Sequence, residues 1–454
     1  MMKKIVIFAF TLCAFLMNVQ HTYAWSLLGD EKKIAYPCGD LQDRIPKIYA
    51  VMIQGYNGWF YKSLDFDAMY RLNASTDTYM QEFQKALAAK DIQLVVFSPL
   101  LPKTYHTANY VSAESREKYY FEPSDIKSLY TRFNQRLSEM GILTTDVSDV
   151  GGMSEEDLFF KTDIHWRPEG ARLTAQKIAQ VIKADKAYND IAKIDVNYKK
   201  LGAAVLESEA NEVLKIYCNS EIPRESSNIY DFEYAVEASA DALFGDDASI
   251  PSIALVGSSF SAVKDYYFND FLEDELSASI ANYAIGGGGL YTAIVSYLSS
   301  NDFIENKPKY LIWEVAGRYD LNQDGDAYFR QMIPSVYGEC RAKDTLANTT
   351  ISLSANDKPN ILLEALETLN VTGSDYYFQF KTDEKALSKF KIEFEYEDGD
   401  GEYFEVDRGG RYINSGHFFV ELSKDINSKL SRVTIENPKQ VEAKLDVKLC
   451  RKSN

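Results

Sequence analysis

Two short segments, far apart in the chain, carry the residue types that serine-based acyl transfer requires. The first reads Thr162-Asp163-Ile164-His165-Trp166 and places a carboxylate two residues before an imidazole. The second reads Gly257-Ser258-Ser259-Phe260-Ser261 and places serines on a turn of small residues, directly after an apolar run. A serine nucleophile needs a base to take its proton and a group to orient that base. The two segments together supply all three.

Histidine is scarce in this chain, which narrows the choice of base. Only His106, His165 and His417 lie outside the N-terminal leader described below. A base for serine at neutral pH needs a pKa near 7, and histidine usually supplies it. His165 alone has a carboxylate two residues away, so Asp163 would hold its tautomer. A capped surface turn is the alternative for this pair, and the serine turn makes that alternative weaker.

The serine turn does not follow the α/β-hydrolase pattern. It lacks the last glycine of G-x-S-x-G, and here the acid and the base come before the serine rather than after it. The spacing does not decide whether Ser258 or Ser259 attacks. A glycine-serine turn without chemical meaning is the alternative for this segment.

A glycine-rich segment offers backbone N–H donors for an oxyanion. Asn282 and the four glycines 286–289 follow the serine, and glycines let a backbone approach a substrate closely. We take Asn282, Gly288 and Gly289 as oxyanion or substrate candidates. A phosphate loop is excluded because no Lys-Ser/Thr follows, and a flexible loop is the remaining alternative. With so few histidines we expect no metal site, and we expect no cofactor.

The N-terminus has the features of a secretory signal peptide. Lys3 and Lys4 precede a short apolar stretch, and Thr22-Tyr23-Ala24 forms a small-residue cleavage site before Trp25. We expect residues 1–24 to be removed. No later segment approaches about 18 uninterrupted apolar residues, so we expect an exported protein that does not span the membrane.

Four cysteines remain beyond the leader, and we expect two disulfides rather than free thiols because the count is even in an exported chain. Three pairings are possible. If each domain folds as a unit, the simplest pairing is Cys38–Cys218 with Cys340–Cys450. No cysteine would then be left to act as a nucleophile.

The chain is acidic, with 67 Asp and Glu against 49 Lys and Arg. This balance argues against nucleic acid as a partner, because nucleic acid needs a basic footprint. It does not exclude an acidic polysaccharide, since a local basic patch can sit on an acidic protein.

The pattern of apolar segments predicts two domains. Up to about residue 335, short apolar runs (92–97, 253–256, 310–312) alternate with helical segments, such as one from Pro168 to Ala184. This alternation predicts an α/β domain over 25–335, with a mostly parallel sheet, helices on both faces and sites at the carboxyl ends of its strands. Over 341–454, short segments with alternating aromatic and β-branched residues predict an antiparallel β-sandwich.

These residues resemble a known family. The two segments above, followed by Trp313-Glu314-Val315-Ala316-Gly317-Arg318-Tyr319, are similar to the SGNH-hydrolase-like polysaccharide O-acetyltransferases of alginate biosynthesis. The segment Gly55-Tyr56-Asn57-Gly58-Trp59-Phe60 and the C-terminal β-rich part resemble the family's two-domain periplasmic members, whose second domain is a carbohydrate-binding module. The resemblance covers essentially the whole mature chain and implies one disulfide per domain.

The resemblance also assigns roles. It places the catalytic Asp-x-His on Asp163 and His165 and the nucleophile on Ser259. The family usually has Pro-Glu before its Arg-Tyr, where this chain has Ala316-Gly317, so Arg318 and Tyr319 are weaker substrate candidates. For polymer contacts in the second domain, the sequence offers Arg408, Arg411 and Tyr412 around a glycine pair, because guanidinium groups suit carboxylated sugars. A plain solvated turn is the alternative for these three.

The resulting hypothesis is a periplasmic O-acetyltransferase. Ser259 would take an acetyl group and pass it to hydroxyls of a mannuronate-containing polymer. The resemblance implies two kinds of partner, a membrane-bound acyltransferase that relays acetyl groups and the proteins of polysaccharide export. Two other hypotheses use the same residues: an acetylesterase in which water resolves the acyl-enzyme, and a non-catalytic polysaccharide-binding scaffold.

Overall fold

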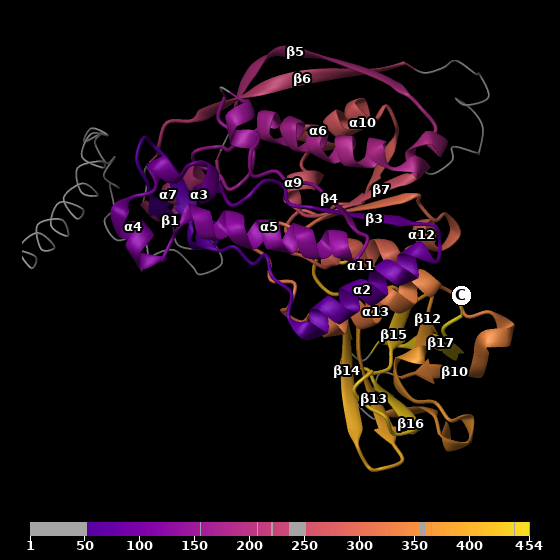
Figure 1. Ribbon diagram of the computed structural model, residues 1–454. Helices are drawn as coiled ribbons and strands as arrows, with labels where there is room; N and C mark the ends of the chain where they lie inside the picture. Colours follow the sequence, from indigo (N-terminus) through magenta and orange to yellow (C-terminus); the bar gives the residue numbers. More distant parts are fainter. Residues whose placement is uncertain are drawn as a thin grey trace, which may run out of the picture.

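The structure, a computed structural model, describes residues 52–154, 156–206, 208–218, 221–235, 251–354, 359–364, 366–439 and 441–453. The expected signal peptide and Cys38, one partner in the expected Cys38–Cys218 bond, lie outside the described residues. No helix within these ranges is long and apolar enough to cross a membrane. Figure 1 shows an α/β part and, below it, a smaller all-β part.

A five-stranded parallel sheet, in the order β4-β3-β9-β7-β8, forms the centre of the α/β part. The central strands are buried and almost entirely apolar, as expected for a sheet covered on both faces. The predicted α/β fold class is thus confirmed. The strands are β3 (Gln93–Phe97), β4 (Leu143–Thr144), β7 (Ile253–Val256), β8 (Ile280–Asn282) and β9 (Tyr310–Glu314).

Helices cover both faces of this sheet. In Figure 1, α6 and α10 lie above the sheet, and α2, α11 and α13 lie below it. Helix α6 begins at Pro168, where the missing N–H leaves no hydrogen bond unmade. The helices of this part are α2 (Ala74–Ala88), α3 (Lys103–His106), α4 (Ala113–Lys118), α5 (Pro123–Glu139), α6 (Pro168–Ala184), α7 (Glu209–Cys218), α9 (Ser259–Ala262), α10 (Phe268–Leu276), α11 (Thr292–Leu298), α12 (Asn301–Glu305) and α13 (Gly325–Tyr337).

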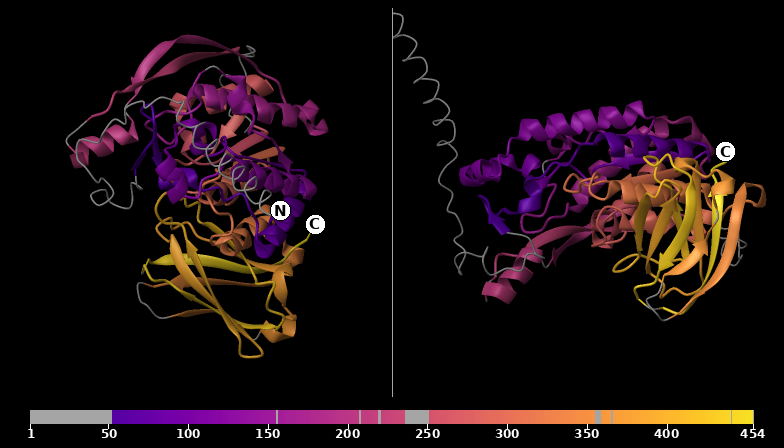
Figure 2. Two further views of the ribbon diagram at one scale, coloured as in Figure 1. Left: turned by 60° about the vertical axis from the view of Figure 1, so that its left-hand side comes forward. Right: turned by 90° about the horizontal axis from the view of Figure 1, so that it is seen from below.

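Two hairpins lie outside the central sheet, and the sequence analysis predicted neither. The strands β5 (Asp195–Leu206) and β6 (Glu225–Ala235) pair as a long antiparallel ribbon between α6 and β7 in the chain. Tyr198 and Tyr230 of this ribbon contact Phe271 of α10, so the ribbon arches over the helices, as Figures 1 and 2 show. The short strands β1 (Met52–Gln54) and β2 (Phe60–Lys62) form the second hairpin.

The C-terminal part consists of two antiparallel four-stranded sheets, β10-β17-β12-β15 and β11-β16-β13-β14. Buried residues of both sheets belong to one apolar core, which confirms the predicted sandwich. The strands are β10 (Thr345–Leu353), β11 (Asn360–Leu363), β12 (Tyr376–Lys381), β13 (Lys389–Tyr396), β14 (Gly401–Asp407), β15 (His417–Glu421), β16 (Leu430–Glu436) and β17 (Ala443–Arg451).

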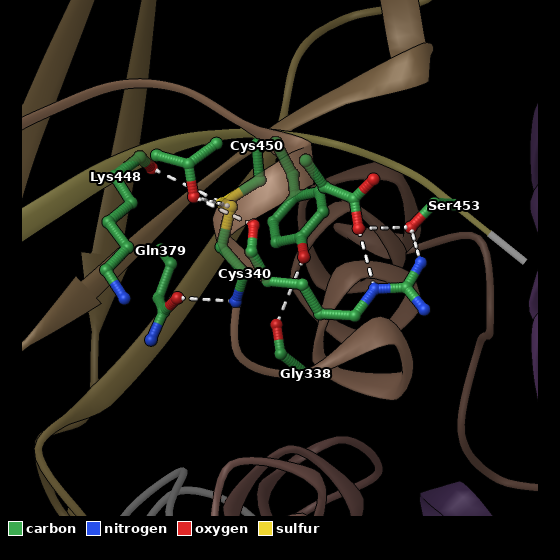
Figure 3. Close-up of a disulfide and its surroundings, with 10 residues drawn as sticks. Gly338, Cys340, Gln379, Lys448, Cys450 and Ser453 are labelled. Atoms are coloured by element: carbon green, nitrogen blue, oxygen red, sulfur yellow. Dashed lines mark hydrogen bonds and ion pairs between the residues drawn. A yellow bond between two sulfur atoms is a disulfide. The ribbon is translucent and has the colours of Figure 1, made fainter.

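A disulfide joins Cys340 to Cys450, as predicted, and ties the segment after α13 to the last strand (Figure 3). The Cα atoms of the two cysteines are 5.8 Å apart. The Cys340 N–H donates to Oε1 of Gln379 at 2.9 Å, and the Tyr377 hydroxyl donates to the Gly338 carbonyl oxygen at 3.1 Å. The bond therefore anchors the linker between the two parts to the sandwich.

The two parts contact each other closely. Arg330 of α13 donates from Nε to the Glu421 carbonyl oxygen at 2.9 Å, and its guanidinium pairs with Glu402 of β14. The loop after β14 docks on α11, where the Ile413 N–H donates to the Ser296 hydroxyl at 3.1 Å. This docking brings the loop 408–416 to the α/β part.

Candidate active site

A tight turn before α6 presents the Asp-x-His pair. Phe159 and Trp166 form an antiparallel bridge, and the Phe160 N–H donates to the His165 carbonyl oxygen at 3.2 Å. Trp166 is completely buried, with its ring against those of Phe260 and Phe268. The buried tryptophan anchors the turn, so that His165 faces the carboxyl ends of the strands.

The structure brings Asp163, His165 and Ser259 together. Nδ1 of His165 lies 2.6 Å from Oδ1 of Asp163, and Nε2 of His165 lies 2.7 Å from Oγ of Ser259. With the proton on Nδ1, the imidazole donates to the carboxylate and accepts from the serine hydroxyl. This chain of hydrogen bonds is the arrangement in which histidine can remove the serine proton.

The structure distinguishes the two serines of the turn. Ser258 is buried and its hydroxyl donates to Oε1 of Glu314 at 2.5 Å, while its N–H donates to Oε2 at 3.1 Å. The Ser261 hydroxyl donates to the same Oε2 at 2.6 Å. A Cβ on Gly257 would lie 2.6 Å from this carboxylate, which is why only glycine fits there. Glu314 therefore fixes the turn through Ser258 and Ser261. Ser259 is the serine that faces the imidazole.

The oxyanion candidates and their neighbours in the glycine loop have different contacts. Asn282 donates from Nδ2 to the Ser261 carbonyl oxygen at 2.8 Å and accepts from the Ala284 N–H at 3.0 Å. The Gly288 N–H donates to the Ile285 carbonyl oxygen at 3.3 Å. Asn282 thus joins its loop to α9, and Gly288 stabilises a turn within the glycine loop. A Cβ on Gly286 would lie 3.7 Å from Cβ of Ser259, so this glycine, which the sequence analysis did not single out, approaches the serine.

Arg318 also reaches the site. Its guanidinium lies 5.2 Å from the ring centre of Phe260, the residue after the serine, and 5.1 Å from that of Tyr319. Phe260 and Arg318 line a small pocket together with Ile164, Leu100 and Lys103. Gly317 has a local reason, because a Cβ there would collide with the hydroxyl oxygen of Tyr70.

The three C-terminal candidates have different positions. Arg408 is only 4% exposed and its guanidinium lies over the Tyr412 ring, so its side chain faces the protein rather than the solvent. Burial lowers the pKa of Arg408 to about 10. Arg411 is exposed, and a Cβ on Gly287 would lie 3.0 Å from its Nε. Arg411 of the C-terminal part therefore lies against the glycine loop that passes beside Ser259.

The sequence analysis did not single out three charged residues that support the site. Glu314 is 2% exposed and Lys103 is 2% exposed, and Glu225 contacts the loop of Asp163. Glu314 ends a buried apolar strand and belongs to the Trp313–Tyr319 segment that carries the resemblance, but the sequence analysis gave it no role. Nothing local marks Lys103 or Glu225, because their partners lie in distant parts of the chain. Within the described ranges, no group of His, Cys, Asp and Glu side chains is arranged to hold a metal ion.

Comparisons with known proteins agree with this architecture. A family model described as the SGNH hydrolase-like domain of acetyltransferase AlgX matches residues 52–317. The chain is 26% identical over 401 residues to the alginate biosynthesis protein AlgX of Pseudomonas aeruginosa, a match that spans 87% of this chain and 83% of that protein. It is 26% identical over 332 residues to the probable alginate O-acetylase AlgJ of Pseudomonas fluorescens, over 68% of this chain and 79% of that protein.

A solved structure is similar over both parts of the chain. The structure of Pseudomonas aeruginosa AlgX superposes with a TM-score of 0.78 and 24% sequence identity, covering 93% of this chain and 100% of that one. This similarity supports the two-part fold.

Proposed function

Because the chain belongs to the family of SGNH hydrolase-like acetyltransferases typified by AlgX, we propose that it acetylates hydroxyl groups of an exported, alginate-like polysaccharide through Ser259. The observation that carries the proposal is the unbroken hydrogen-bond chain from Asp163 through His165 to Ser259. The names of the AlgX and AlgJ relatives support a polysaccharide as the acceptor.

The reaction proceeds in two halves. In the first half, His165 takes the hydroxyl proton as Oγ of Ser259 attacks the acetyl carbonyl of the donor, and the imidazolium then protonates the departing group. In the second half, His165 takes the proton of a sugar hydroxyl as its oxygen attacks the acetyl-serine. The bond to Oγ breaks, the sugar ester leaves, and the proton returns to Ser259. Asp163 stabilises the imidazolium in both halves.

Charge near the serine favours an acidic acceptor. The protein as a whole carries a formal charge of −18, which repels a polyanion. Two arginines nevertheless lie beside neighbours of Ser259. Arg318 lies over the ring of Phe260, and Arg411, from the C-terminal part, lies beside Gly287 in the glycine loop. Guanidinium groups form paired hydrogen bonds with carboxylates. We propose that these two arginines guide a carboxylated sugar to the acetyl-serine.

The location of the reaction determines its donor. An exported protein has no supply of acetyl-coenzyme A, so we propose that a membrane-bound acyltransferase delivers the acetyl group to this protein in the periplasm. The protein would act beside the polysaccharide export proteins, which are the partners that its family implies.

Acetyl transfer from a chromogenic acetyl ester to mannuronate oligomers tests the proposal. Mass spectrometry should show oligomers that gain one acetyl group with wild-type protein and none with Ser259→Ala. Ser258→Ala is the matched control, because it removes the adjacent hydroxyl but not the attacking one, and it should retain part of the activity. Ester cleavage without acetylated oligomer would favour an esterase. Transfer that survives in Ser259→Ala would refute the proposal.

A further inference from the structure

A buried lysine holds the loop of Asp163 from one side. Nζ of Lys103 donates to the carbonyl oxygens of Phe60 at 2.6 Å, Lys161 at 3.0 Å and Asp163 at 2.8 Å. These three bonds use all the hydrogens of the ammonium group. The rings of Trp59 and Tyr61 lie 5.3 and 5.4 Å from Nζ, within cation–π distance. Lys103 thus joins the β1–β2 hairpin to the loop that carries the Asp-x-His pair.

A carboxylate holds the same loop from the other side. Glu225, the first residue of β6, accepts the Lys161 N–H at 2.9 Å through Oε2 and the Thr162 N–H at 2.9 Å through Oε1. The Thr162 hydroxyl donates to Oε1 at 2.6 Å. The Thr162 carbonyl oxygen accepts from the Ala210 N–H at 3.2 Å. Backbone groups of residues 161–163 are therefore bound on both sides by partners from distant parts of the chain.

This arrangement is costly, which argues that it does more than fold a loop. Burial lowers the pKa of the Lys103 ammonium to about 8, although the carboxylates of Asp65, Asp163 and Glu225 oppose that change. Burying an ammonium group is unfavourable unless it is fully hydrogen-bonded. A neutral side chain or the backbone itself could close an ordinary loop without that cost. Two of the three ammonium hydrogens and both oxygens of Glu225 bind residues 161–163, the segment that ends at Asp163.

We propose that Lys103 and Glu225 are positioning residues that clamp residues 161–163 from both sides and so fix the Asp163 carboxylate against His165. The inference rests on the proposed function, since it assigns these residues to the same acyl-transfer site. Neither residue touches the reacting atoms. Both act through Asp163, and their contribution should therefore depend on its carboxylate.

A double-mutant cycle tests this dependence. The rate measured is the labelling of Ser259 by phenylmethylsulfonyl fluoride, followed by peptide mass spectrometry, because this reaction needs no sugar or partner protein. Lys103→Met should slow labelling about 10- to 100-fold, the effect of misplacing a catalytic group by about 1 Å. In the Asp163→Asn background the same change should cost less than about threefold, because the clamp then positions no carboxylate.

A second variant and a control complete the test. Glu225→Gln keeps the shape of the side chain but turns one acceptor into a donor facing an N–H, so it should also slow labelling only when Asp163 is present. Lys177→Met removes a lysine of α6 whose partner is Asp149, 3.0 Å away, and it should leave labelling within about twofold of wild type. If Lys103→Met fails to fold, Glu225→Gln decides.

Two results would overturn the inference. One is the same fold-change from Lys103→Met whether or not Asp163→Asn is also present, which would make the lysine merely structural. The other is labelling at the wild-type rate by folded Lys103→Met and Glu225→Gln. If wild-type Ser259 is not labelled at all, the proposed function fails and this inference falls with it.

Discussion

Replacing Glu314 tests what holds the serine turn in place, because its carboxylate binds Ser258 and Ser261 but not the proposed nucleophile Ser259. Its carboxylate accepts three hydrogen bonds, two from Ser258 and one from the Ser261 hydroxyl, and it is 2% exposed. Glu314→Ala leaves these three buried donors without a partner. Each such group costs about 1–3 kcal/mol, so the sum is about 3–9 kcal/mol. A domain has about 5–15 kcal/mol of stability in total, and the variant should therefore be close to unfolding.

Glu314→Gln is the matched control for that loss. Its amide oxygen can take the place of Oε2 and accept from the Ser258 N–H and the Ser261 hydroxyl, while its NH₂ donates to the Ser258 hydroxyl. Only the hydrogen of the Ser258 hydroxyl then loses its acceptor, and the bonds that remain lose their charge assistance, which roughly halves their strength. We expect Glu314→Gln to lose about 1–3 kcal/mol and to keep measurable Ser259 chemistry.

Urea unfolding followed by tryptophan fluorescence measures both changes, because Trp313 is the residue before Glu314 and is fully buried. Linear extrapolation gives the free energy of unfolding. A loss of less than about 1 kcal/mol in Glu314→Ala would refute the view that the carboxylate satisfies buried donors. Equal losses in the alanine and glutamine variants would refute the view that its shape, and not only its charge, holds the turn.

Three further predictions concern other parts of the molecule. Arg411→Ala should raise KM for acidic oligomers about tenfold and leave hydrolysis of a neutral acetyl ester unchanged; equal effects on both substrates would exclude a role in sugar binding. Burial raises the pKa of Glu421 from 4.5 to about 7, so the stability that its proton contributes is present below pH 4.5 and is lost as the pH rises through 7. Glu421→Gln should therefore gain about 3 kcal/mol in urea unfolding at pH 8 and almost nothing at pH 4; a gain independent of pH would contradict this. Replacing Cys340 and Cys450 by serine should lower the unfolding free energy of the sandwich by about 5 kcal/mol, since the bond closes a loop with a sequence separation of 110, and intact Ser259 labelling would show that the α/β part is spared.

The sequence predicted the features that depend on local pattern. The strands β3, β7 and β9 lie where the sequence analysis found short apolar runs. Helix α6 begins at Pro168, as the sequence analysis expected. The Asp-x-His pair and the serine turn follow from residue types and from the rule that parallel strands end at one edge. The pairing of Cys340 with Cys450 follows from the even count and the division into two domains.

Features that depend on distant contacts were not predictable in this way. Strand β5 is mostly exposed and its apolar residues do not alternate, so its sequence carries no strand pattern. Strand β6 does alternate, with Tyr230, Phe232 and Tyr234 separated by acidic residues, but its antiparallel pairing with β5 depends on a distant segment. Arg408 lies beside two glycines in the sequence, which suggests an exposed turn, yet Tyr412 and the docking of the loop on α11 bury it. Lys103 contacts backbone groups 43, 58 and 60 residues away, and no pattern of residue types marks such a contact.

The most direct test of the account is to trap the acyl-enzyme. Wild-type protein would be mixed with a chromogenic acetyl ester, quenched in acid and digested, and the peptides would be sequenced by mass spectrometry. The account predicts one acetyl group on Ser259, none on Ser258 or Ser261, and none on any of the three in His165→Ala. Acetyl on Ser258 in place of Ser259, or ester turnover by Ser259→Ala at the wild-type rate, would contradict the central claim.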